Sequence, residues 1–160
     1  MTPLAPSNSE SQSSAWESEV RRAAFYFRAA LIEGGLEWEL FKDFPRGVCG
    51  DTCLLLGQYL SNLGLGEWLY CSGSSYGPNG EFRSHAWLVQ NGWIVDITAD
   101  QFEDVTETVT FTRDWTWYRD RFPEQTMAMV AGTNYFDPQE GRRLLHDFQV
   151  LEQRANQASR

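Results

Sequence analysis

Three side chains of this 160-residue chain have the types that nucleophilic chemistry requires: Cys49, His85 and Asp96. A thiolate attacks a carbonyl carbon, an imidazole takes and returns the proton, and a carboxylate holds the imidazole in one orientation. We therefore take Cys49 as a candidate nucleophile, His85 as its base and Asp96 as the group that orients the base, if folding brings the three together.

The segment 84–98 predicts a β-hairpin that joins the histidine to the carboxylate. Asn91-Gly92 is a dipeptide that tolerates positive φ at both central positions of a type I′ turn, and apolar strand residues flank it. If the residues on either side of this turn pair, His85 lies two positions from the residue opposite Asp96. The two side chains then project from the same face of the sheet, within reach of one another.

Cys49 lies where a loop at 44–48 gives way to an apolar segment that predicts a helix from about residue 50 to 63, stopped by Gly64. The free N–H groups and the dipole at a helix N-terminus stabilise a thiolate, the nucleophilic form of cysteine. The same N–H groups are natural donors to an oxyanion. We expect the Asp51 carboxylate to point away from the thiol and to cap this helix.

The remaining elements predict an α+β fold in which the helix bearing the cysteine packs on an antiparallel sheet. Ser14 and Glu17 resemble a capping box at the start of a first helix, which ends at Gly34-Gly35. Further strands are expected at 67–72 and 105–112, a last helix opens at Asp137-Pro138, and the segments 36–44 and 126–132 are left without an assignment. We expect a flexible tail over 1–13, a single domain over 14–154 and a polar tail over 155–160.

Composition excludes several classes of function. A net charge of −9 disfavours nucleic-acid binding, because phosphates would be repelled, and is otherwise typical of a soluble protein. No run of about 18 apolar residues is present, and the first residues lack the basic and apolar regions of a signal peptide, so we expect neither membrane insertion nor export. Three cysteines without framework spacing indicate free thiols in a reducing, cytoplasmic compartment.

The motifs around the three residues resemble those of the transglutaminase-like branch of the papain-like cysteine enzymes. The resemblance covers roughly residues 44–102 and rests on Gly47-Val48-Cys49, on His85-Ala86-Trp87 and on Gly92-Trp93 followed by Asp96-Ile97-Thr98. It implies a papain-like core and a cofactor-free thiol acyl transfer to water, as in a peptidase or deamidase acting on a peptide, protein or small amide. Transfer to a lysine amine would instead give cross-linking. The chain departs from the family at Cys53, where a small residue is common, and no glutamine upstream of Cys49 stands where the oxyanion donor of papain-type enzymes would be expected.

Other interpretations of the same residues stay open at this point. Asp100 competes with Asp96 for the orienting role, His146 is expected on the surface, and Cys53 and Cys71 are expected to be core thiols. A zinc site is another possibility, because four side chains near each other in these motifs offer N, S and O ligands: Cys49, Cys53, His85 and Asp96. Structural zinc sites usually contain two close cysteine pairs, however, and this sequence has no second pair. Finally, an acidic chain of this size could be a catalytically inactive binding or inhibitory module on the same fold.

Overall fold

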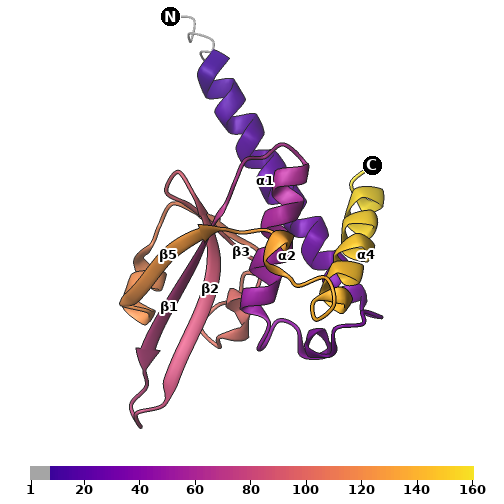
Figure 1. Ribbon diagram of the computed structural model, residues 1–160. Coiled ribbons are helices and arrows are strands. Elements are labelled where there is room, and N and C mark those ends of the chain that lie inside the picture. Colours follow the sequence, from indigo (N-terminus) through magenta and orange to yellow (C-terminus); the bar gives the residue numbers. More distant parts are fainter. Residues whose placement is uncertain (1–7) are drawn as a thin grey trace, which may run out of the picture.

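The structure, a computed structural model, combines helices with one antiparallel sheet and describes residues 8–160 apart from the side chain of Ala128 (Figure 1). The helices are α1 (Asn8–Glu33), α2 (Cys49–Asn62), α3 (Thr116–Arg121) and α4 (Arg142–Ala158), with short 3-10 turns η1 (Glu39–Asp43), η2 (Ala99–Gln101) and η3 (Thr133–Tyr135). The strands are β1 (Leu69–Tyr76), β2 (Phe82–Gln90), β3 (Trp93–Asp96), β4 (Thr110–Thr112) and β5 (Glu124–Val130). The α+β class predicted from the sequence is therefore correct.

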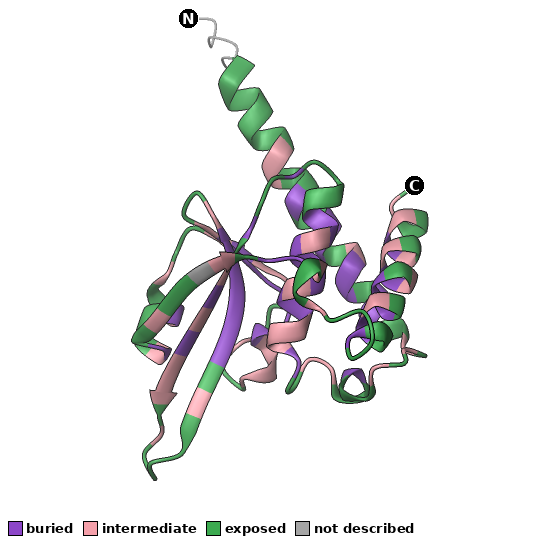
Figure 2. Ribbon diagram, viewed as in Figure 1, coloured by how far each residue is buried: buried purple, intermediate pink, exposed green. Residues whose placement is uncertain are grey.

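The five strands lie in the order β4-β3-β2-β1-β5, and every neighbouring pair is antiparallel. Helices α1, α2 and α4 cover one face of the sheet, where Ala86 and Leu88 of β2 join a large apolar core. Helix α3 covers the other face, where Trp87 of β2 packs with Tyr118 and Phe122 in a smaller core. Strand β2 is consequently buried on both faces along its second half (Figure 2).

The hairpin between β2 and β3 has the predicted turn and register. Asn91 has φ of 50° and Gly92 has φ of 80°, as a type I′ turn requires. The cross-strand pairs are Gln90 with Trp93, Val89 with Ile94 and Leu88 with Val95. This register places His85 and Asp96 on the same face of the sheet.

The first and last helices extend further than the sequence predicted. Helix α1 begins at Asn8 rather than at Ser14, because no proline or glycine interrupts the helix upstream of its buried face; residues 1–7 of the predicted tail lie outside the described residues. Helix α4 continues to Ala158, because Ala155, predicted to begin the polar tail, is completely buried against the rest of the protein.

Two predicted strands have different lengths in the structure. Only Thr110–Thr112 of the segment 105–112 is a strand, because its partner β3 ends at Asp96, which pairs with Thr110. Strand β1 instead continues past its predicted end at residue 72, through Gly73 and the two serines that follow, to Tyr76. A Cβ atom on Gly73 would lie 2.6 Å from Phe122 and 2.8 Å from Trp87, so glycine here is required by packing rather than by a turn.

Candidate active site

Cys49 is the first residue of α2 and is half-buried. The first hydrogen bond of the helix runs from the Thr52 N–H to the Val48 carbonyl, at 2.9 Å. The N–H groups of Cys49, Gly50 and Asp51 therefore precede the helical ladder and remain at the positive end of the helix dipole. The Cys49 thiol therefore lies at the N-terminus of α2, as the sequence predicted.

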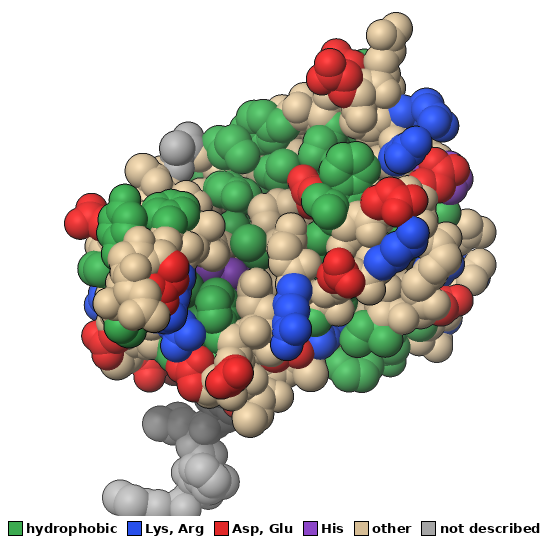
Figure 3. Space-filling model, turned by 90° about the horizontal axis from the view of Figure 1, so that it is seen from below, with side chains coloured by type: hydrophobic (Ala, Val, Ile, Leu, Met, Phe, Trp, Pro, Cys, Tyr) green, Lys and Arg blue, Asp and Glu red, His purple; other side chains and the backbone are tan. Residues whose placement is uncertain are grey.

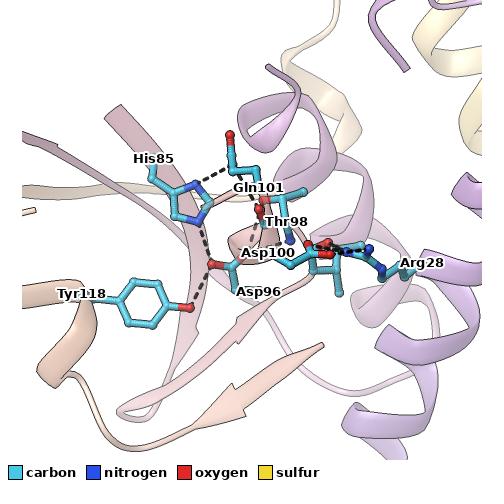
Figure 4. Close-up of polar contacts among 8 residues, drawn as sticks. Arg28, His85, Asp96, Thr98, Asp100, Gln101 and Tyr118 are labelled. Carbon is cyan, nitrogen blue, oxygen red and sulfur yellow. Dashed lines mark hydrogen bonds and ion pairs between the residues drawn. The ribbon is translucent and has the colours of Figure 1, made fainter. Parts of the chain in front are cut away.

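His85 and Asp96 form a buried pair on the sheet. The distance from His85 Nε2 to Asp96 Oδ2 is 2.7 Å, and the two residues are 1% and 2% exposed (Figure 4). A carboxylate is stable at such a buried position only when it is paired and hydrogen-bonded. The hairpin register therefore brings together the two residues that the sequence predicted to meet.

Three further hydrogen bonds fix the Asp96 carboxylate. Thr98 donates to Oδ1 from its N–H at 2.9 Å and from its hydroxyl at 3.2 Å, and the Tyr118 hydroxyl donates to Oδ2 at 2.9 Å. Burial alone would raise the pKa of Asp96, but the charge of His85 and these hydrogen bonds lower it below the ordinary value. Asp96 is therefore ionised and held in one orientation.

The Cys49 thiol lies near enough to the imidazole of His85 to affect its protonation. Burial lowers the pKa of His85, but the charge of Asp96, its hydrogen bond and the contact with Cys49 outweigh burial and raise that pKa to about 9. The ring is therefore protonated near neutral pH. The structure thus connects all three candidate residues in the order thiol, imidazole, carboxylate.

The thiol and the imidazole meet although they belong to opposite sides of the sheet. Helix α2 packs on the face of Ala86 and Leu88, whereas His85 alternates to the face of Trp87. Strand β3 pairs only with residues 88–90 of β2, so the first part of β2, including His85, has no partner on that side.

Gln101, in the turn η2, contacts the other ring nitrogen of His85. Its amide Nε2 lies 3.2 Å from His85 Nδ1 and donates to the Thr98 carbonyl at 3.1 Å. If the Gln101 amide N–H donates to His85 Nδ1, that nitrogen carries no proton and the ring is neutral. If Nδ1 is protonated, it donates instead to an acceptor, such as the Gln101 amide oxygen or the Cys49 sulfur. Sequence reasoning missed Gln101 and Tyr118, since neither belongs to a motif around the three candidates.

Asp100 does not take the orienting role for which it was an alternative. Its carboxylate accepts two hydrogen bonds of 2.7 Å from the guanidinium of Arg28, which also donates to the Ile97 carbonyl at 2.6 Å. Arg28 comes from α1 and lies over the ring of Phe44, at 5.1 Å. This pair joins α1 to the loop before Cys49 and to the segment after Asp96.

The capping role predicted for Asp51 is also wrong. No side chain caps the start of α2, and Asp51 instead accepts a hydrogen bond of 3.0 Å from the indole of Trp38. Burial raises the pKa of the Asp51 carboxyl, while the hydrogen bond from Trp38 acts in the opposite direction.

The two other cysteines are buried free thiols, as expected. Burial raises the pKa of Cys53 well above its ordinary value and that of Cys71 to about 11, so both stay protonated. The zinc alternative has no structural support, because within residues 8–160 no three His, Cys, Asp or Glu side chains are grouped as metal ligands. His146, on α4, has about half of its side chain exposed, as predicted.

An open cleft of about 670 Å³ lies beside these residues. It is lined by the loop before Cys49, from Asp43 to Gly47, and by Asp100 and Gln101. Seen from below, the protein surface carries acidic and basic side chains close together, with hydrophobic patches between them (Figure 3). The cleft therefore offers an extended ligand both polar and apolar contacts.

The comparisons with known proteins leave the family open: no protein-family model matches the chain, and neither the curated proteins nor the solved structures include a significant match. None of the helices within residues 8–160 is long and apolar enough to cross a membrane.

Proposed function

We propose that this protein is a cysteine-dependent acyl-transfer enzyme that hydrolyses an amide bond, with Cys49, His85 and Asp96 as its triad. The observation that carries the proposal is the connected set of contacts: Cys49 to the imidazole, and the imidazole to Asp96 at 2.7 Å. The motif resemblance to transglutaminase-like enzymes supports the same assignment independently.

The reaction has two halves. The Cys49 sulfur, as the thiolate paired with protonated His85, attacks the amide carbonyl, whose oxygen becomes an oxyanion near the free N–H groups at the start of α2. The intermediate collapses when His85 protonates the leaving amine, which leaves an acyl-thioester on Cys49. His85 then takes a proton from water, the hydroxide attacks the thioester, and the acid and the free thiol are released.

Asp96 contributes through His85 rather than through the substrate. Its oxygen accepts the Nε2–H of the ring at 2.7 Å, which leaves Nδ1 for proton exchange with the thiol. Hydrogen bonds from Tyr118 and Thr98 keep the carboxylate from rotating. We assign water as the acceptor because the cleft beside the triad is open and partly polar; an amine acceptor would make the enzyme a transglutaminase.

One observation favours a second candidate, an inactive acidic binding or inhibitory module. The Gln101 amide lies 3.2 Å from His85 Nδ1, the nitrogen through which the thiol proton must pass. If Gln101 keeps its N–H directed at this nitrogen, the imidazole cannot receive the proton. The test below separates the two candidates, because an inactive module forms no acyl-enzyme.

The test uses p-nitrophenyl acetate, an activated ester that acylates a reactive thiol. We expect rapid release of p-nitrophenolate and a single acetyl group on Cys49, located by mass spectrometry of peptides. Cys49→Ala and His85→Ala should abolish the rapid phase, whereas Cys71→Ala, which removes a buried thiol in the smaller core, should keep it. Equal acetylation of the Cys49→Ala variant would contradict the proposal. Methylamine in the same assay shows whether an amine competes with water.

A further inference from the structure

Tyr70, on β1, places its hydroxyl beside the start of the helix that carries Cys49. A Cβ atom on Gly50 would lie 3.0 Å from the Tyr70 hydroxyl oxygen, closer than side chains ordinarily pack. The absence of a side chain at Gly50 therefore lets the hydroxyl approach the backbone next to the thiol. Tyr70 itself is half-buried, with its ring against the large apolar core.

This hydroxyl has no hydrogen-bond partner among the described residues of the protein, although buried tyrosine hydroxyls usually have one. The two tyrosines that are largely buried illustrate the rule: Tyr59 donates to Asn156 and Tyr118 donates to Asp96. Tyr70 is thus a donor held in place by its ring and free to bind something else.

The electrostatic surroundings keep the proton on this oxygen. Burial is the main cause that raises the pKa of Tyr70, to about 12, and negative charge at Cys49 and Asp51 adds to it. The contact with Gly50 places this hydroxyl beside the residue that follows Cys49 in the chain. At neutral pH Tyr70 therefore remains an O–H donor beside the nucleophile.

We propose that Tyr70 is a catalytic residue whose hydroxyl donates a hydrogen bond to the oxyanion formed when Cys49 attacks a carbonyl. This inference rests on the proposed function and adds a donor that the motifs do not contain. The free N–H groups of Cys49 and Gly50 would supply the other donors. A side-chain donor would take the role of the papain-type glutamine, which is missing from its expected position upstream of Cys49.

The acetylation of Cys49 by p-nitrophenyl acetate shows where this donor acts. With the proton already on His85, the thiolate sulfur forms a bond to the carbonyl carbon, and the π electron pair moves to the carbonyl oxygen. That oxygen returns the pair as the bond to p-nitrophenolate breaks. Iodoacetamide reacts differently: sulfur displaces iodide from a CH2 carbon, and no oxyanion forms. The two reagents therefore separate oxyanion stabilisation from thiol reactivity.

The experiment compares Tyr70→Phe with wild type for both reagents. We expect acetylation by p-nitrophenyl acetate to slow by about 10²-fold, the loss typical of one oxyanion donor, while alkylation by iodoacetamide keeps its wild-type rate. Tyr76→Phe is the matched control, because this tyrosine is 75% exposed near the β1–β2 turn and should leave both rates unchanged. Gly50→Ala, which crowds the Tyr70 hydroxyl, should also slow acetylation.

The outcomes distinguish this inference from the proposed function. If Tyr70→Phe slows neither reaction, Tyr70 is not an oxyanion donor, although the triad stands. If it slows both reactions equally, Tyr70 affects the thiol itself and the inference is wrong. If wild type is not acetylated at Cys49 at all, the proposed function fails first. Urea unfolding of Tyr70→Phe confirms that the variant is folded.

Discussion

At the scale of single residues, the properties of the site follow from burying His85 and Asp96 together. Both side chains are almost completely buried, and a single charge at either position would lose its hydration without a partner to compensate it. Together they form an ion pair that raises the pKa of His85 to about 9 and lowers that of Asp96. Cys49 sits beside the protonated ring, an arrangement that favours a thiolate–imidazolium pair.

This pairing predicts how stability depends on pH. The pKa of His85 is about 9 in the folded protein and 6.5 in the unfolded chain, so the stabilisation is complete below pH 6.5 and is lost as the pH rises through 9. The shift corresponds to about 3 kcal/mol of unfolding free energy. Urea unfolding at pH 6.5 and pH 9.5 should show a decrease of this order in wild type.

The control is His85→Gln, which cannot titrate. Its stability should be lower at pH 6.5, because Asp96 loses its charged partner, and it should change much less between the two pH values. An equally steep decrease in this variant would show that another group titrates and that the pair does not stabilise the fold.

At the scale of elements, the site depends on Arg28 of α1, which lies far from the motifs in sequence. Its bonds to Asp100 and to the Ile97 carbonyl hold the segment that contains Thr98 and Gln101, and its stacking on Phe44 holds the loop before Cys49. One buried guanidinium thus positions both sides of the cleft relative to each other.

Arg28→Met should therefore destabilise the protein by about 3 kcal/mol, because the buried pair loses one partner and leaves Asp100 uncompensated. Urea unfolding measures the loss. Arg83→Met is the matched control, since the Arg83–Glu81 pair is 41% exposed on both sides and its loss should leave the unfolding midpoint unchanged. Equal effects of the two substitutions would refute the positioning role of Arg28.

The sequence predicted correctly those elements that are determined by residues close to them in the chain. The Asn91-Gly92 turn and the strand alternation around it determine the β2–β3 register, and hence the pairing of His85 with Asp96. Helix α2 was predicted within one residue at each end, because its apolar face and Gly64 are local signals. The lengths of β1 and β4 were missed, because they depend on strands and rings that are distant in sequence.

The same distinction separates the parts of the site that were found from those that were missed. Cys49, His85 and Asp96 stand in motifs that can be recognised along the chain. Tyr118, Gln101 and Arg28 reach the site only through packing of α3, η2 and α1, so no short pattern marks them. Asp51 was assigned wrongly because its position suggested a cap, whereas Trp38 supplies the closer partner.

At the scale of the whole molecule, the two cores on either side of the sheet decide which thiols solvent reaches. Cys53 belongs to the large core and Cys71 to the small one, with exposures of 5% and 0%, whereas Cys49 is half-buried at the start of α2. The fold thus protects two of the three cysteines.

The number of reactive thiols should therefore change from one to three when the protein unfolds. With Ellman's reagent at pH 7, we expect one rapid equivalent in the native state and three in urea. Cys49→Ala should lose the rapid equivalent, and Cys71→Ala should keep it. Rapid labelling of two or three thiols in the folded protein would show that the cores do not shield Cys53 and Cys71.

The central claim is that His85 activates the Cys49 sulfur, and the rate of Cys49 alkylation by iodoacetamide as a function of pH tests it most directly. Wild type should be alkylated nearly as fast at pH 6.5 as at pH 8.5, because the protonated imidazole holds the thiolate. His85→Gln should be slow at pH 6.5 and should accelerate steadily as the pH rises, as an ordinary thiol does. Profiles of the same ordinary shape in both proteins would contradict the triad.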